Sequence, residues 1–160
     1  MYFKATLLSL SAALTLVVAS GGGPADAAGF GPAASSPMAA ARMLVAQKKW
    51  DAALEQLEVV NRPDSADWNH LMGVSLRQAT PSDDIAAERY FDAALRIDPR
   101  HRGALQDSGE LYLARGNLPR AELRLAMLDQ ACRFGCPEFT ALVAAVRRDR
   151  DLRLQVSSAR

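Results

Sequence analysis

Apolar and polar residues follow a helical spacing from Pro37 onward, without the two-residue alternation typical of a half-buried strand. Short breaks interrupt this pattern at "KKW", "NRPDS", "ATPSD", "DPRH", "RGN" and "RFGCP". Ser36 and Pro37 form a favourable helix start, because Ser can cap the first turn and Pro tolerates a position whose amide would be unpaired. The pattern predicts an all-α fold.

The helical segments repeat with a period of 34 residues. Each repeat carries a small alanine, a large apolar residue one turn later and another apolar residue after that, which places a stripe on one helix face. The three columns are Ala53, Ala87 and Ala121; Leu57, Phe91 and Leu125; and Val60, Ala94 and Leu128. Since such a stripe must be buried, each of these segments is predicted to pack against a neighbouring helix.

This pattern resembles the tetratricopeptide repeat family, whose repeats pair Trp, Leu and Gly on a first helix with Ala, a large apolar residue and Pro on a second. The second repeat contributes "WNHLMGVSL" (68–76) and "AERYFDAALRIDP" (87–99). The third repeat matches at Leu105, Gly109, Tyr112, Gly116, Ala121 and Leu125, and the first at Ala41, Leu44, Trp50, Ala53 and Leu57. The resemblance covers about residues 35–132 and implies a solenoid of helical hairpins.

The expected architecture is therefore three tetratricopeptide-like repeats, at about 37–63, 66–99 and 102–132, plus a C-terminal capping helix at 136–156. Gly73 and Gly109 are 36 residues apart, so the second repeat is predicted to contain a longer internal turn at 79–84. The capping helix carries Phe139, Leu142, Val143 and Val146 on one face. Its other end is rich in Arg and Asp and is predicted to face water, because a solenoid needs a polar terminal cap.

The N-terminus has the features of a secretory signal peptide at 1–27. Lys4 provides a basic start, residues 5–19 form an apolar run, and "ADA" at 25–27 offers small residues for cleavage. The run has fifteen residues, fewer than the roughly 20 that span a bilayer. Residues 28–36 are predicted to form a flexible leader. We expect export to a bacterial periplasm, with membrane contact only if the signal segment stays uncleaved.

Composition argues against several functions. The formal net charge is +1, which gives no basic face for nucleic acid. The sequence lacks the glycine loops, nucleophile motifs and metal-binding helix motifs of common enzymes. We therefore expect a non-enzymatic protein without a cofactor. The sequence contains sixteen arginines and three lysines and is rich in alanine, as expected for a GC-rich bacterial genome.

The resemblance implies a protein or peptide partner bound in a concave groove lined by first helices. In the first helix of the third repeat, Leu105, Ser108, Gly109 and Tyr112 are predicted to form the core face. The remaining positions of this helix are then free to face the groove. The predicted lining is Arg42, His70, Val74, Arg77, Gln106, Glu110 and Leu113, with Met38, Val45, Asp67 and Gly103 beside them. This lining is mixed in charge and lacks the Lys/Asn/Arg set that clamps a C-terminal carboxylate in some relatives. The sequence does not identify the partner, and it leaves a homo-oligomer open.

Cys132 and Cys136 flank a glycine-containing break directly before Pro137. In an exported protein this spacing favours a structural disulfide across a tight corner. A redox-active pair, half of a soft-metal site and two packed thiols are the alternatives. The chain is therefore predicted to be a periplasmic interaction module that acts as a scaffold or adaptor. The alternative function is a thiol-dependent redox or metal-handling accessory.

Overall fold

The computed structural model describes residues 36–159, and within them it contains helices and no strands. The predicted signal peptide, and the leader up to residue 35, lie outside the described residues. The helices are α1 (Pro37–Ala46), α2 (Trp50–Val60), α3 (Ala66–Gln78), α4 (Asp84–Ile97), α5 (Arg102–Ala114), α6 (Leu118–Ala131) and α7 (Pro137–Ser158). The all-α prediction is confirmed.

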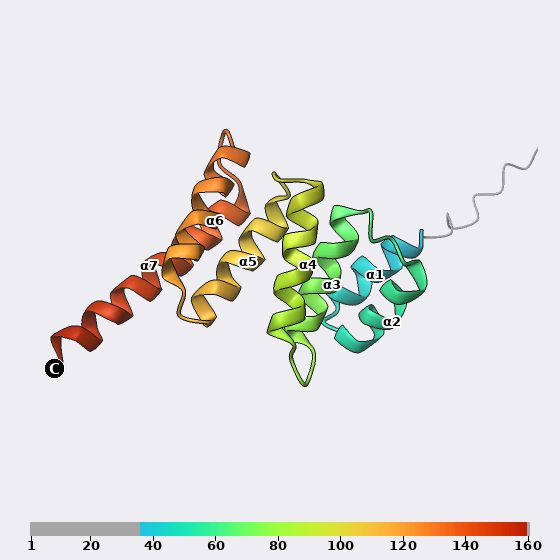
Figure 1. The fold of residues 1–160 in the computed structure, drawn as a ribbon, viewed down its shortest axis with the longest axis horizontal. Coiled ribbons are helices and arrows are strands. Elements are labelled where there is room, and N and C mark those ends of the chain that lie inside the picture. The colour runs from blue at the N-terminus through green and yellow to red at the C-terminus, as the bar shows by residue number, and fades with distance from the viewer. Residues whose placement is uncertain (1–35, 160) are drawn as a thin grey trace, which may run out of the picture. The chain divides into compact units, whose positions relative to one another are not determined.

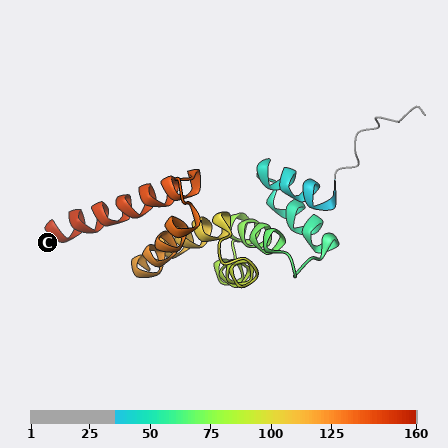
Figure 2. The same cartoon turned by 90° about the horizontal axis from the view of Figure 1, so that it is seen from above.

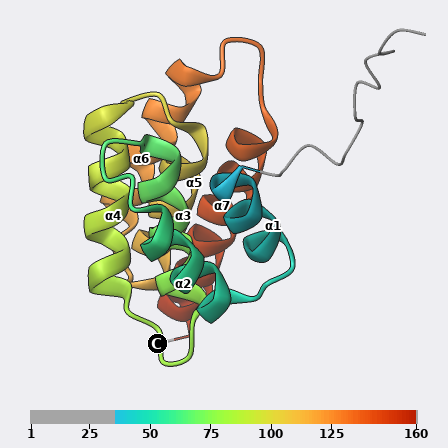
Figure 3. The same ribbon diagram turned by 90° about the vertical axis from the view of Figure 1, so that its right-hand side faces the viewer.

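Consecutive helices pair as hairpins, α1 with α2, α3 with α4 and α5 with α6, and neighbouring hairpins stack along the chain (Figure 1). The first helices α1, α3 and α5 contact one another in order, and α7 continues this series by packing on α5 and α6. Viewed along the stack, α4 and α6 lie on one side and α1 and α7 on the other (Figure 3). The predicted solenoid of helical hairpins is confirmed.

The repeated alanines lie where helices cross. Ala53, Ala87 and Ala121 are all fully buried. In the second hairpin, a methyl group added to Gly73 would lie 2.6 Å from a ring carbon of Phe91 and 3.1 Å from the backbone oxygen of Ala87. Small residues at these positions therefore allow the backbones of paired helices to approach. Burial varies more in the other two columns, because Leu125 in the second column and Val60 in the third are only partly buried.

The second repeat contains two irregularities, of which the longer internal turn was predicted. The turn between α3 and α4 spans residues 79–83 and contains a cis Thr80–Pro81 peptide bond. Asp83 closes the turn by accepting a hydrogen bond from the Ala86 amide at the start of α4. Trp68 lies one place away from the family position, yet it is buried and its indole Nε1 donates to the Leu57 backbone oxygen at 2.8 Å. This bond ties the second hairpin to the first.

The capping helix α7 differs from the prediction at its C-terminal end. Leu142 and Val146 are buried against the third hairpin, as expected. Beyond them α7 runs past the other helices (Figure 2), and Leu152, Leu154 and Val156 are exposed. This end is rich in Arg and Asp and was predicted to face water, but it also exposes these three apolar residues, which no neighbouring helix covers. No helix within residues 36–159 is both long and apolar enough to span a membrane.

Candidate interaction face on the first helices

Polar side chains from three consecutive hairpins meet on one surface, which we call the first-helix face. It comprises Arg42 on α1, Asp67, His70 and Arg77 on α3, His101 at the start of α5, and Gln106, Asp107 and Glu110 on α5. Helical spacing explains this arrangement, because the opposite faces of α3 and α5 carry the buried apolar residues. The residues on this face therefore come from three repeats but form connected contacts.

Asp67 links all three hairpins. Its carboxylate accepts a hydrogen bond from the Arg42 guanidinium on one side and lies 3.0 Å from His101 Nε2 on the other. His101 Nδ1 accepts the Ala104 amide at 3.0 Å, capping α5, so the proton of the neutral ring is on Nε2 and is donated to Asp67. The hydrogen bond from His101, followed by that from Arg42, lowers the pKa of Asp67 below its ordinary value.

His70 forms a second link between α3 and α5. Its Nε2 lies 2.6 Å from Asp107 Oδ2, and its ring centroid is 4.9 Å from that of His101. A methyl group on Gly103 would lie 2.6 Å from the His70 ring, so glycine at this position leaves room for the imidazole. The two histidines therefore lie next to each other at the junction of the second and third hairpins. His70 belongs to the predicted groove lining, and His101 lies at its border.

Arg77 is the least accessible cation of the first-helix face. Its side chain is 18% exposed. One guanidinium nitrogen lies 3.4 Å from the Asp107 backbone oxygen and 3.8 Å from a Glu110 carboxylate oxygen. Gln106 Nε2 donates to the other carboxylate oxygen of Glu110 at 3.0 Å. Both contacts of Arg77 are long, so its charge is only weakly compensated on this face.

The structure brings together most of the residues predicted from the sequence, but not all in the same role. Arg42, His70, Arg77, Gln106 and Glu110 are within the network just described. Val74 and Leu113 are partly buried and pack against apolar core clusters. They therefore pack beneath the first-helix face and offer little free surface to a ligand.

Asp107 and His101 are two residues of the first-helix face that lie outside the predicted lining. Asp107 lies 37 residues after His70 and is therefore out of step with the 34-residue repeat. His101 lies 34 residues after Asp67 but precedes α5, so it was not counted among the residues of the first helices. A search for acids facing histidines across adjacent first helices would have found both. Among residues 36–159, no group of three or more His, Cys, Asp or Glu side chains is arranged to hold a metal ion.

The two cysteines lie at a corner away from the first-helix face. Cys132 directly follows α6 and Cys136 precedes α7, and the pair is joined as a disulfide with Cα atoms 5.7 Å apart. Gly135 adopts a φ of 81°, which favours glycine and completes the turn. Cys136 Sγ also accepts the Phe139 amide at 3.4 Å, so it caps α7. Both residues are buried, an environment suited to a structural staple.

Residues 85–146 match a protein family described as tetratricopeptide repeat. The matched range includes most of α4, all of α5 and α6, and the beginning of α7. No curated protein and no solved structure matches the chain. The family match covers the part of the chain where the repeat pattern is most regular.

Proposed function

From the match of residues 85–146 to a family described as tetratricopeptide repeat, we propose that this chain is a non-enzymatic interaction module. It binds one protein or peptide along the first-helix face and acts as a scaffold or adaptor. Stacked helical hairpins of this kind present an extended surface to which each repeat contributes side chains. A partner lying across the face contacts residues of α1, α3 and α5 together.

The observation that carries this proposal is the polar network that joins three hairpins on the first-helix face. Arg42, Asp67 and His101 bring one residue from each of three successive hairpins into contact. Charged groups on this face are already held in position, so little side-chain entropy is lost when a partner binds. Such an arrangement provides orientation and specificity more than raw affinity.

Accessibility divides the face into two roles. Arg42 and Asp67 are about half exposed, at 51% and 52%, so a partner can reach them directly. Arg77 and His70 are largely covered and are fixed by their neighbours on α5. We expect the exposed pair to contact the ligand and the covered pair to set the shape and charge of the face.

We further propose that the protein works outside the cytosol, in a bacterial periplasm. This rests on the signal-like N-terminal sequence and on a cysteine pair placed for a disulfide, which persists in oxidising compartments. Protease protection of the mature chain in intact cells, followed by its loss after outer-membrane permeabilisation, would test this location. Finding the protein in the cytosol with both thiols reduced would contradict it.

The experiment that tests the function starts by isolating a partner from the native periplasm and purifying it. Its Kd is then measured by titration calorimetry with the parent and with Arg42→Glu, Arg77→Glu and Glu110→Arg. We expect each reversal to weaken binding by roughly tenfold or more, because truncating or reversing an interfacial charge changes affinity by ~1.4 kcal/mol or more.

The matched control is Arg148→Glu, an exposed reversal on α7 away from the first-helix face. It should leave the Kd unchanged. Arg150 is a poorer control, because its guanidinium contacts Glu122 on α6 at 2.7 Å. Loss of binding with Arg148→Glu but not with Arg42→Glu would place the binding site on the C-terminal helix and refute the proposal.

A further inference from the structure

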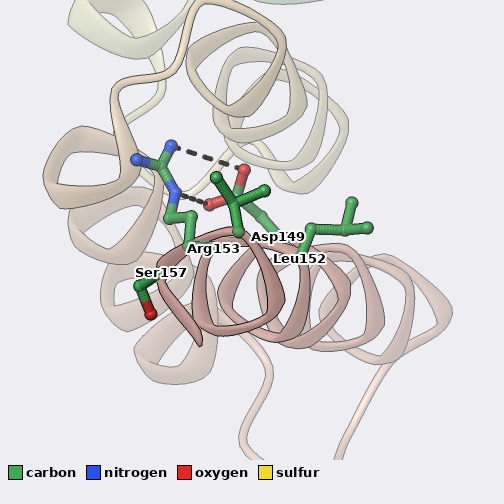
Figure 4. A pocket seen from close by; sticks show the side chains of 5 residues that line it. Asp149, Leu152, Arg153 and Ser157 are labelled. Carbon is green, nitrogen blue, oxygen red and sulfur yellow. Dashed lines mark hydrogen bonds and ion pairs between the residues drawn. The ribbon is translucent and has the colours of Figure 1, made fainter. Parts of the chain in front are cut away.

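The open depressions on the surface differ in whether their polar side chains already have partners. In the depression along the exposed end of α7, Asp149 and Arg153 pair with each other one turn apart (Figure 4). Arg153 also donates to the Gly116 backbone oxygen at 3.1 Å. The charged groups of that depression are therefore satisfied within the chain, and they offer little to a polar ligand.

The cleft between α4 and α6 is bridged by ion pairs. Arg120 contacts Glu88 at 3.0 Å, and Arg124 contacts Asp92 at 2.6 Å. Tyr112 lies beneath the two guanidinium groups and donates its hydroxyl to Glu88 at 3.1 Å. The arginines on α6 therefore reach across to α4, and their charges are compensated there.

The side of α4 that corresponds to this face of α6 carries no such bridge. Ala86 and Tyr90 lie 34 residues before Arg120 and Arg124, so they occupy the equivalent places in the second repeat. An open depression of about 350 Å³ lies here, and we call it the Asn69 pocket. Its lining residues are Asn69, Ala86, Arg89, Tyr90 and Ala93. Where the third repeat has long cationic side chains, the second repeat therefore has a space.

Asn69 provides a free hydrogen-bond acceptor in this pocket. The residue is only 3% exposed, and its side-chain amide nitrogen donates to the backbone oxygens of Pro63 at 2.9 Å and Ser65 at 2.8 Å. Backbone oxygens accept and do not donate, so these two bonds fix the orientation of the amide and use both of its hydrogens. Within residues 36–159 no donor bonds to Oδ1, which is therefore available to a ligand.

Arg89 provides the complementary donors. It is exposed, it is the one charged residue in the lining, and no carboxylate of the described chain lies within ion-pair distance of it. Glu58 on α2 is the equivalent of Asp92 in the first repeat, but it neither lines the pocket nor pairs with Arg89. The Tyr90 ring packs edge-on against Trp68, with ring centroids 5.8 Å apart, which fixes the wall beside Arg89.

We infer that the Asn69 pocket binds an N-acylated amino acid, either as a free small molecule or as the C-terminal residue of a peptide. In this class of ligand, one carbon atom separates an amide N–H from a carboxylate. The N–H donates to Asn69 Oδ1, and the carboxylate accepts from the Arg89 guanidinium, whose planar donors suit a carboxylate. Ala86 and Ala93 leave room for a small side chain. The volume is within the range of small-ligand sites.

Both polar groups are needed to select this class. A simple anion would pair with Arg89 but leave Asn69 Oδ1 without a donor, whereas a neutral amide would leave Arg89 without a counter-charge. A ligand that carries both groups satisfies the pocket. The inference is independent of the proposed function, because no lining residue of the Asn69 pocket belongs to the first-helix face.

The test is a nuclear magnetic resonance titration of the purified protein with N-acetyl-L-alanine. We expect a Kd of roughly 0.1 to 10 mM, because so small a ligand makes few contacts. N-acetyl-L-alaninamide lacks the carboxylate, and O-acetyl-L-lactate replaces the N–H with oxygen. Each should bind roughly tenfold more weakly or worse, since a buried polar group is then left unpaired.

A longer probe, the N-acetylated alanine tripeptide with a free carboxylate, distinguishes the two sources of the ligand. Tighter binding than that of N-acetyl-L-alanine supports the end of a peptide, because residues beyond the pocket then contribute. Equal or weaker binding supports a free small molecule.

Two variants test the residues. Arg89→Gln removes the charge, and Ala93→Met fills the pocket with the residue that the third repeat carries at position 127. Both positions are at least partly exposed, so folding should persist, which thermal melting checks. Each variant should weaken binding of N-acetyl-L-alanine by roughly tenfold or more. Arg96→Gln is the matched control, because Arg96 is an exposed arginine on the same helix outside the pocket.

Arg96→Gln should bind N-acetyl-L-alanine like the parent. So should Arg42→Glu, which alters only the first-helix face. Absence of binding at the upper end of the expected range, equal binding of either analogue, unchanged binding by Arg89→Gln, or an equal loss with Arg96→Gln would each overturn the inference.

Discussion

The alanines at the helix crossings leave no room for a larger side chain, which makes them sensitive positions at the residue scale. Ala87 is fully buried, and its backbone oxygen already lies within 3.1 Å of the position that a methyl group on Gly73 would occupy. Close packing in such a site means that added methyl groups must displace neighbouring atoms. A residue as small as alanine is therefore required by geometry and not only by helix propensity.

We predict that Ala87→Leu lowers the free energy of unfolding by about 1–3 kcal/mol, because it overpacks the junction between α3 and α4. Urea denaturation followed by circular dichroism measures this change. The matched control is Ala126→Leu on α6, where the alanine is exposed and the same substitution should be nearly neutral. Equal stability of Ala87→Leu and the parent would contradict the assigned register of the repeats.

Asp67 provides a pH-dependent prediction. The hydrogen bond from His101, followed by that from Arg42, lowers its folded-state pKa below the ordinary value of 3.8. Its contribution to stability is therefore fully present above the ordinary pKa and is lost as the pH falls through the lowered pKa of the folded state. Asp67→Asn should flatten the fall in unfolding free energy between about pH 5 and pH 2.

Urea titrations at several pH values measure this slope. Glu58→Gln, a change at an exposed acid on α2, is the control and should keep the slope of the parent. If Asp67→Asn and the parent lose stability in parallel, the contacts of Asp67 with His101 and Arg42 do not form in solution.

At the element scale, helix ends depend on local chemistry that can be read from short stretches of sequence. Ser36, Ser65, Asp83 and Asn117 each cap the helix that follows them by accepting a backbone amide. Cys136 takes the same position before α7, with the added constraint of its disulfide. The corner between α6 and α7 therefore combines a cap and a covalent link within five residues.

We predict that replacing both cysteines with serine lowers the melting temperature by a few degrees. The closed loop is short, so its loss removes roughly 2 kcal/mol from the free energy of unfolding. Serine at position 136 can still cap α7, which confines the change to the covalent link. Scanning calorimetry of the parent with and without reductant should reproduce the difference, and partner binding should persist in the double variant.

A different outcome would support the redox or metal alternative. Accessible thiols in the purified protein, combined with unchanged melting and lost function in the serine variant, would show that the cysteines act chemically and not as a staple.

At the scale of the whole molecule, three apolar clusters lie along the stack within residues 36–159. One contains Leu57 and Trp68, a second contains Phe91 and Leu111, and the third includes Leu128 and Leu142 at the capped end. In such stacks each repeat is stabilised mainly by its neighbours, so local changes can uncouple one end from the other. The terminal hairpin α1–α2 has a neighbouring hairpin on one side only within the described residues.

We predict that Leu57→Ala lowers stability by about 2–5 kcal/mol and that the loss is concentrated in the first cluster. Tryptophan fluorescence, which comes from Trp50 on α2 and the buried Trp68 on α3, should then change at lower urea than the helical circular dichroism signal. Leu142→Ala is the matched truncation at the capped end. In this variant the helical circular dichroism signal should change at lower urea than the tryptophan fluorescence. Coincident transitions in both variants would show that the stack unfolds as a single unit.

The repeat pattern specified the order of hairpins and the crossing residues, because burial of a helical stripe depends on residue type and spacing alone. It did not specify the pairing of His70 with Asp107 or of His101 with Asp67. Those contacts depend on side-chain conformations across neighbouring helices, at separations of 37 and 34 residues, and on the space left by Gly103. The exposure of Leu152, Leu154 and Val156 on α7 was not predicted either, since composition shows where charges are but not where neighbouring helices end.

The disulfide at the corner between α6 and α7 also limits how two chains can exchange parts. Domain swapping requires the hinge between two elements to straighten, so that the terminal element can pack on another molecule. Cys132 and Cys136 hold the ends of this hinge with Cα atoms 5.7 Å apart, and a closed hinge cannot open. The oxidised chain must therefore keep its own α7, and exchange of this helix between molecules becomes available only after reduction.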